Sequence, residues 1–148
     1  MRNRAAAQVS PFVTYWLPVV AYAVLIFVLS AQSHPERLFP SFLERLGDKL
    51  SHVIEYGVFA VLWYRAFRHA WYGATALTAL LLSIAAATAY GISDEIHQAF
   101  VPSRTSDSWD VAADLGGACL GSSMWFFLGE RRPVTGPSKP YQRKQRVG

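Results

Sequence analysis

The sequence is poor in cysteine, and its longest apolar runs lack charge. Cys119 is the only cysteine among the 148 residues, so no intrachain disulfide can form. The runs 12–31 and 74–92 contain no aspartate, glutamate, lysine or arginine. Each is close to the roughly 20 apolar residues that a helix needs to cross the hydrocarbon core of a bilayer. The absence of charge therefore predicts two membrane-spanning helices.

Two further runs, 50–67 and 108–128, are apolar over most of their length but begin with polar residues. With them, the chain is predicted to be all-α and to form one four-helix transmembrane bundle. We divide it into a cytoplasmic N-terminus (residues 1–11), a four-span membrane domain (12–128) and a basic cytoplasmic tail (129–148). The tail is polar and contains three prolines, which is typical of disorder.

The loop that precedes the second span contains the pattern of a short helix. Ser41 and Glu44 have the spacing of a capping box, and Gly47 can end a helix. The apolar residues between them recur on one helical face. We therefore expect a short interfacial helix on the outer membrane surface, which anchors the loop or covers the polar ends of the spans.

The net charge of +4 is distributed in a way that predicts topology. If the N-terminus is cytoplasmic, the inner segments hold ten of the 14 lysines and arginines, and Glu130 is their only acid. The outer segments and helix ends hold the other nine acids. An inner excess of lysine and arginine sets orientation, so both termini are predicted to be cytoplasmic and the protein to lie in the plasma membrane. The basic tail is read as a topology signal that contacts anionic lipids, and no nucleic-acid partner is expected.

Polar side chains gather at the predicted outer ends of three spans. Charges at such depth are expensive, so they are a functional-site hypothesis by default. Glu55 and Asp114 each lie two helical turns inside a span. Polar residues three or four positions away from each of them lie on the same face of the helix. The candidate binding residues are Asp48, Lys49, His52, Glu55, Tyr56, Asp94, Glu95, Gln98, Arg104, Asp107, Asp110 and Asp114.

The fourth span also carries a ladder of small residues. Ala113, Gly117 and Gly121 follow one another at four-residue steps. Small residues at this spacing allow another helix to approach closely in a membrane. Packing is therefore a sufficient explanation for the two glycines, whereas it does not explain the buried position expected for Asp114.

Three motifs in this order resemble the VanZ-like family of small membrane proteins, named for a glycopeptide (teicoplanin) resistance determinant. They are Asp48-Lys49-x-x-His52-x-x-x-Tyr56, then Ser93-Asp94-Glu95-x-x-Gln98-x-Phe100-x-Pro102-x-Arg104, then Asp110-x-x-x-Asp114-x-x-Gly117. The resemblance covers about half of the chain. It departs from the family pattern at Ser103, where glycine is usual, and at Asp114, where asparagine is common. It implies a multi-span envelope protein linked to cell-wall or surface-polymer function, without a defined reaction.

Three functions are consistent with the polar cluster. The first is a pocket that binds a lipid-linked or cell-wall precursor, or a glycopeptide, alongside membrane lipids. The second is a membrane enzyme for a lipid-linked substrate, in which Lys49 and Arg104 hold a phosphate or carboxylate. Its catalytic candidates are His52, Glu55, Glu95 and Arg104.

The third function is structural, with ion pairs that latch the helix ends together. The sequence has no recognised metal-site spacing, so neither a metal nor another cofactor is assigned. The side chains of His52, Glu55, Asp94, Glu95 and Asp110 nevertheless offer nitrogen and oxygen ligands to a divalent cation.

Overall fold

The computed structural model describes residues 10–31, 41–71, 73–101 and 107–129, with the backbone alone for 41–45. These residues form four helices: α1 (Pro11–Ser30), α2 (Ser41–Ala70), α3 (Ala76–Gln98) and α4 (Ser108–Gly129). The described part of the chain contains no strand. The predicted all-α four-helix bundle is therefore confirmed.

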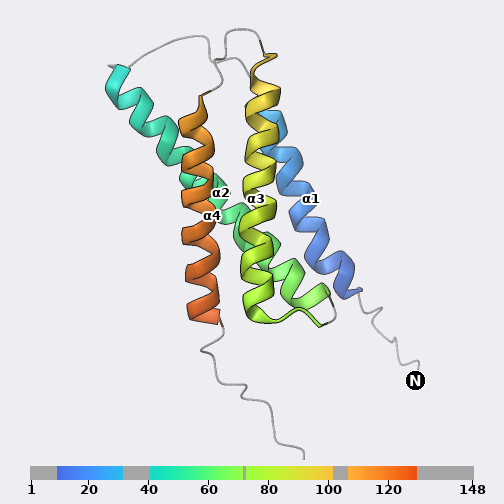
Figure 1. Ribbon diagram of the computed structural model, residues 1–148. Coiled ribbons are helices and arrows are strands. Elements are labelled where there is room, and N and C mark those ends of the chain that lie inside the picture. The colour runs from blue at the N-terminus through green and yellow to red at the C-terminus, as the bar shows by residue number, and fades with distance from the viewer. Residues whose placement is uncertain (1–9, 32–40, 72, 102–106, 130–148) are drawn as a thin grey trace, which may run out of the picture.

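Consecutive helices run in opposite directions, as Figure 1 shows. The start of α1 and the end of α4 consequently lie at the same end of the bundle. At the opposite end, α2 and α4 begin and α3 finishes (Figure 1). Helix α2 crosses the bundle obliquely and packs against all three other helices, whereas α1 packs chiefly against α2. This arrangement brings the polar residues of α2, α3 and α4 to one end.

Three of the helices, α1, α3 and α4, are long and apolar enough to cross a membrane. Much of the surface of α1 is apolar and exposed, as expected for a helix that faces lipid tails. Helix α2 is the longest, with 30 residues and a length of about 45 Å. It is not one of these three helices, because polar and charged residues, among them His52, Glu55 and Arg65, interrupt its apolar middle. The length and the apolar character of these three helices indicate that the chain is a membrane protein.

The segment expected to form a separate interfacial helix is helical, but it is the beginning of α2. The helix runs from Ser41 through Gly47 without interruption. Gly47 does not adopt the left-handed conformation of a helix end, and the hydroxyl of Ser51 donates to its carbonyl oxygen as in a continuing helix. Contacts of Lys49 with α4 stabilise the helical turn that follows Gly47.

Glycines allow α4 to pack directly on the backbone of α2. A Cβ atom on Gly117 would collide with the carbonyl oxygen of Val53, and one on Gly121 would collide with that of Gly57. The close approach predicted from the small-residue ladder is therefore confirmed. It also fixes the rotation of α4, so that Asp110 and Asp114 face α2.

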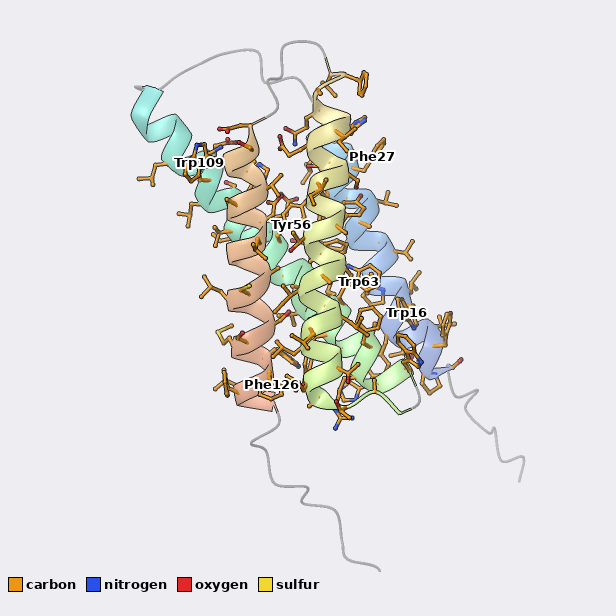
Figure 2. The ribbon with its side chains drawn as sticks, in the orientation of Figure 1. Trp16, Phe27, Tyr56, Trp63, Trp109 and Phe126 are labelled. Atoms are coloured by element: carbon orange, nitrogen blue, oxygen red, sulfur yellow. The ribbon has the colours of Figure 1, made fainter. Side chains whose placement is uncertain are left out.

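Aromatic side chains fill the other half of the bundle. Trp16 of α1 makes edge-to-face contacts with Trp63 and Phe67 of α2, at ring-centroid distances of 5.5 and 5.6 Å. Figure 2 shows Trp16 and Trp63 on the side of the bundle where α1 meets α2. The hydroxyl of Tyr90 donates to the carbonyl oxygen of Ala23 at 2.6 Å, which ties α3 to α1. This packed half holds the helices in register for the polar end.

Candidate functional site

The structure brings the described polar candidates to the same end of the bundle. Helix α2 supplies Asp48, Lys49, His52 and Glu55, α3 supplies Asp94, Glu95 and Gln98, and α4 with the residue before it supplies Asp107, Asp110 and Asp114. Tyr56 is fully buried midway along the bundle (Figure 2) and lines neither of the two cavities described below. Arg104 lies outside the described residues.

Lys49 joins α2 to α4. Its Nζ donates to Asp107 Oδ2 at 2.8 Å and to Asp110 Oδ1, and lies 3.9 Å from Asp48 Oδ2. Lys49 precedes the predicted span 50–67. Burial disfavours its ammonium form, but the hydrogen bonds to Asp107 and Asp110 outweigh this effect, so the pKa of Lys49 lies above its ordinary value. Because its ammonium is already paired, Lys49 is poorly placed to hold a ligand phosphate.

Two of the acids act on the first turn of α4. Glu95 Oε2 accepts a hydrogen bond from the backbone N–H of Asp107 at 2.8 Å. Asp107 Oδ1 in turn accepts one from the backbone N–H of Trp109 at 3.0 Å. Carboxylates in these positions satisfy free N–H groups and complement the positive end of the helix dipole. Glu95 and Asp107 therefore have a structural use.

His52 and Asp114 form a buried pair between α2 and α4. His52 Nδ1 lies 2.8 Å from Asp114 Oδ1, and the two residues are only 7% and 1% exposed. When Asp114 is ionised, Nδ1 carries a proton and donates it to the carboxylate, and in the neutral form of the ring the lone pair is then on Nε2. The ring of His52 is also parallel to that of Tyr56. The orientation of the imidazole is thus fixed from two sides.

A polar cavity of about 150 Å³ lies between α1, α2 and α3. Three acids, Asp48, Glu55 and Asp94, line it together with His52. Gln98 also lines it and donates from Nε2 to Asp94 Oδ2 at 2.9 Å. The remaining lining residues are Ile26, Leu29, Ser30 and Ser51. The cavity therefore offers mainly hydrogen-bond acceptors and negative charge.

An apolar groove of about 480 Å³ lies between the same three helices. On α2 and α3 its lining begins one turn from the lining of the polar cavity, since Phe59 follows Glu55 and Tyr90 precedes Asp94. On α1 the two linings overlap, because Phe27 of the groove lies between Ile26 and Leu29 of the cavity. The rest of its lining is Trp16, Val19, Val20, Ala23, Val24 and Trp63. Figure 2 shows Phe27, Trp63 and Trp16 spaced along this side of the bundle. The groove and the cavity are thus neighbours on the side of the bundle where α1, α2 and α3 meet.

Sequence reasoning missed three residues of this region. Ser30 and Ser51 line the cavity, and Gly91 lies against the carboxylate of Asp114. Ser51 falls one residue before His52, and Ser30 is the last residue of α1, so both could have been considered as polar residues near helix ends. Gly91 has no sequence signal of its own, because the helix that faces it is known only from the fold.

These features define a small helical membrane protein with a polar crevice at one end of its bundle. The sequence model of the VanZ/LLP1 family matches residues 2–129. The chain therefore belongs to the VanZ/LLP1 family. Searches among curated proteins and among solved structures found no match.

Proposed function

We propose that this VanZ/LLP1 protein binds an amphipathic cell-envelope ligand, with the head group in the polar cavity and the hydrocarbon chain in the apolar groove. The observation that supports this most strongly is the succession of cavity and groove along α2 and α3, with α1 bordering both. A lipid-linked precursor has the same succession of polar and apolar parts.

Selectivity is expected to come from the head group. A hydrocarbon chain that moves from lipid into the groove exchanges one apolar environment for another, so little hydrophobic driving force favours the groove. In the cavity, by contrast, Asp48, Glu55 and Asp94 can accept hydrogen bonds from sugar hydroxyls or pair with an amine. Lys49 is paired with Asp107 and Asp110, so the described residues favour such a head group over a bare phosphate.

The ligand class follows from this chemistry and from the family. A lipid-linked or cell-wall precursor carries hydroxyls, and a glycopeptide carries both hydroxyls and amines. Resistance of the teicoplanin type would follow if the bound molecule is the antibiotic or a precursor that binding withdraws from it. Arg65 lies at the opposite end of the bundle, over the rings of Tyr15 and Trp125. Because arginine favours the cytoplasmic side of a membrane, this position supports an outward orientation of the acidic end.

A specific observation also favours an enzyme as the second candidate function. His52 lines the cavity while Asp114 holds its Nδ1, which is the arrangement that prepares a histidine to act as a general base through Nε2. The nucleophile would then be a water molecule in the cavity, since the hydroxyl of Ser51 is hydrogen-bonded to the Gly47 carbonyl oxygen. The reaction class would be hydrolysis of a lipid-linked envelope substrate.

The structural latch is supported by those contacts of the cluster that join one helix to another. The contacts of Lys49 with Asp107 and Asp110 join α2 to α4. Glu55 and Asp94 line the cavity instead, and the hydrogen bond of Asp94 is to Gln98 on its own helix. We therefore assign the latch to Lys49 and its partners and to the pair of His52 and Asp114, and the binding function to the cavity.

Binding can be tested with purified protein in detergent and a lipid-linked cell-wall precursor. We expect saturable binding by the wild type and at least a tenfold weaker affinity for Glu55→Gln and for Asp94→Asn. Ser93→Ala is the matched control, because Ser93 is exposed on α3 beside Asp94 and its hydroxyl bonds only to the Tyr90 carbonyl oxygen among the described residues. Equal binding by all four proteins would contradict the proposal. Mass spectrometry of the incubated precursor would reveal turnover and so decide for the enzyme.

A further inference from the structure

We propose that Asp48, His52 and Asp110 form a binding site for one divalent transition-metal ion at the edge of the polar cavity. One ligand atom from each residue lies within 4.8 Å of the ligand atoms of the other two. Asp48 and His52 are four residues apart on α2 and so share one face, while Asp110 approaches from α4. The inference goes beyond ligand binding and can be tested without the ligand.

The geometry suits an ion of the size of Zn²⁺. Bonds of about 2.0–2.2 Å to nitrogen and oxygen place neighbouring ligand atoms roughly 3–4 Å apart. Because the three ligand atoms lie within 4.8 Å of one another, binding requires a contraction of at most about 1 Å, to which rotation of the exposed Asp48 side chain can contribute. The two buried ligands are held in place by their partners, His52 by Asp114 and Asp110 by Lys49.

His52 is the observation that distinguishes this group from a simple cluster of acids. Its side chain is buried, and Asp114 occupies Nδ1 while Nε2 has no hydrogen-bond partner among the described residues. A carboxylate that orients a histidine from behind is the usual support of a metal-binding imidazole. Nitrogen ligation also favours Zn²⁺ and similar metals over Mg²⁺ and Ca²⁺, which prefer oxygen.

The charges of the surrounding groups are compatible with one dication. The two carboxylates of Asp48 and Asp110 balance the charge of the ion, and the imidazole of His52 is neutral. Asp114 contacts His52 and is not itself a ligand. Lys49 bonds to Asp107 and to one oxygen of Asp110 and lies 3.9 Å from Asp48 Oδ2, so Asp48 and Asp110 each have a second oxygen for the metal. Three protein ligands leave at least one coordination position for water or for a ligand group in the cavity, which Asp48 and His52 also line.

The test uses full-length protein purified in detergent on a tag without histidine and stripped with a chelator. Equilibrium dialysis against ZnCl₂ followed by elemental analysis should find one Zn²⁺ per chain. Asp48→Ala and His52→Ala should each weaken the affinity at least tenfold, and Mg²⁺ at the same concentration should not compete. Asp48 is exposed, so its replacement leaves folding intact even if His52→Ala does not fold.

Glu55→Gln is the matched control, because Glu55 is an acid of the same cavity and the same helix but does not belong to the three-residue group. It should bind Zn²⁺ as the wild type does. Absence of binding by the wild type, or wild-type affinity in Asp48→Ala, would overturn the proposal. A similar loss in Glu55→Gln would also overturn it, by showing diffuse attraction to negative charge. Failure of precursor binding with Zn²⁺ binding intact would contradict the proposed function alone.

Discussion

The carboxylate of Asp114 fits against Gly91, and only a residue without a side chain leaves room for it. A Cβ atom at position 91 would collide with Asp114 Oδ2. The other oxygen, Oδ1, meets His52 Nδ1 at 2.8 Å. A glycine on α3 therefore determines where an acid of α4 can hold a histidine of α2, and the buried pair depends on all three helices.

Gly91→Ala should therefore displace Asp114 and destabilise the protein by about 1–3 kcal/mol, the usual cost of overpacking. Thermal unfolding in detergent measures the change. In an Asp114→Ala background the same replacement should cost much less, because the atom it strikes is gone. Equal costs in the two backgrounds would show that Gly91 is not needed for the fit of Asp114.

Gly117→Ala should weaken the packing of α4 on α2. The added methyl group meets the rigid backbone carbonyl of Val53, so the helices must separate, at a cost of about 1–3 kcal/mol. Gly116→Ala is the matched control on the same helix, because a Cβ there has no neighbour within 4 Å. It should be neutral or slightly stabilising, because alanine has the higher helix propensity. Unfolding temperatures that fall equally in the two variants would contradict this account of the interface.

Lys49→Met should loosen the polar end of the bundle. It removes hydrogen bonds to Asp107 and Asp110 and leaves these acids without their cation, at a cost of about 1.5–3 kcal/mol. Because the folded-state pKa of Lys49 is raised, its contribution is complete below the ordinary lysine pKa of about 10.4 and is lost as pH rises through the folded value. The free energy of unfolding should therefore be lower for the variant than for the wild type at pH 7, and the difference should disappear only at high pH. A constant difference between them would contradict the pairing.

The orientation of the bundle can be tested with reporter fusions. A reporter that is active only in the cytoplasm should function at both termini, because the positive residues favour the inner side. A reporter that needs the outer compartment should function when inserted into the loop between α3 and α4. Activity of the outer reporter at the C-terminus would reverse the predicted orientation and place the cavity on the inner face.

The sequence was sufficient to predict four spans and the end of the bundle where the polar residues meet, but it did not predict that the expected interfacial helix is continuous with α2. Charge-free runs defined α1 and α3, and the ladder that contains Gly117 and Gly121 predicted a close helix contact. Helical spacing also placed Asp48 and His52 on one face.

The side-chain pairings between helices could not be predicted from the sequence. Several acids are possible partners of Lys49, and the sequence provides no reason to prefer one of them. Only the rotation of α4 in the fold selects Asp107 and Asp110. The same rotation places Asp114 against His52. The position of Glu55 in the cavity depends instead on the packing of α1 and α3 against α2. The apolar groove was missed because its lining, taken helix by helix, is indistinguishable from ordinary lipid-facing surface.

The most direct measurement is the amount of envelope lipid that the protein retains when it is purified in mild detergent, determined by mass spectrometry. Val20 lines the groove and Leu17 does not, although both are exposed on α1 at 57% and 61%. We predict that Val20→Trp, which fills the groove, and Asp94→Asn, which alters the cavity, both lose the bound lipid, and that Leu17→Trp retains it at the wild-type level. Equal retention in all three variants would contradict the claim that cavity and groove hold one ligand.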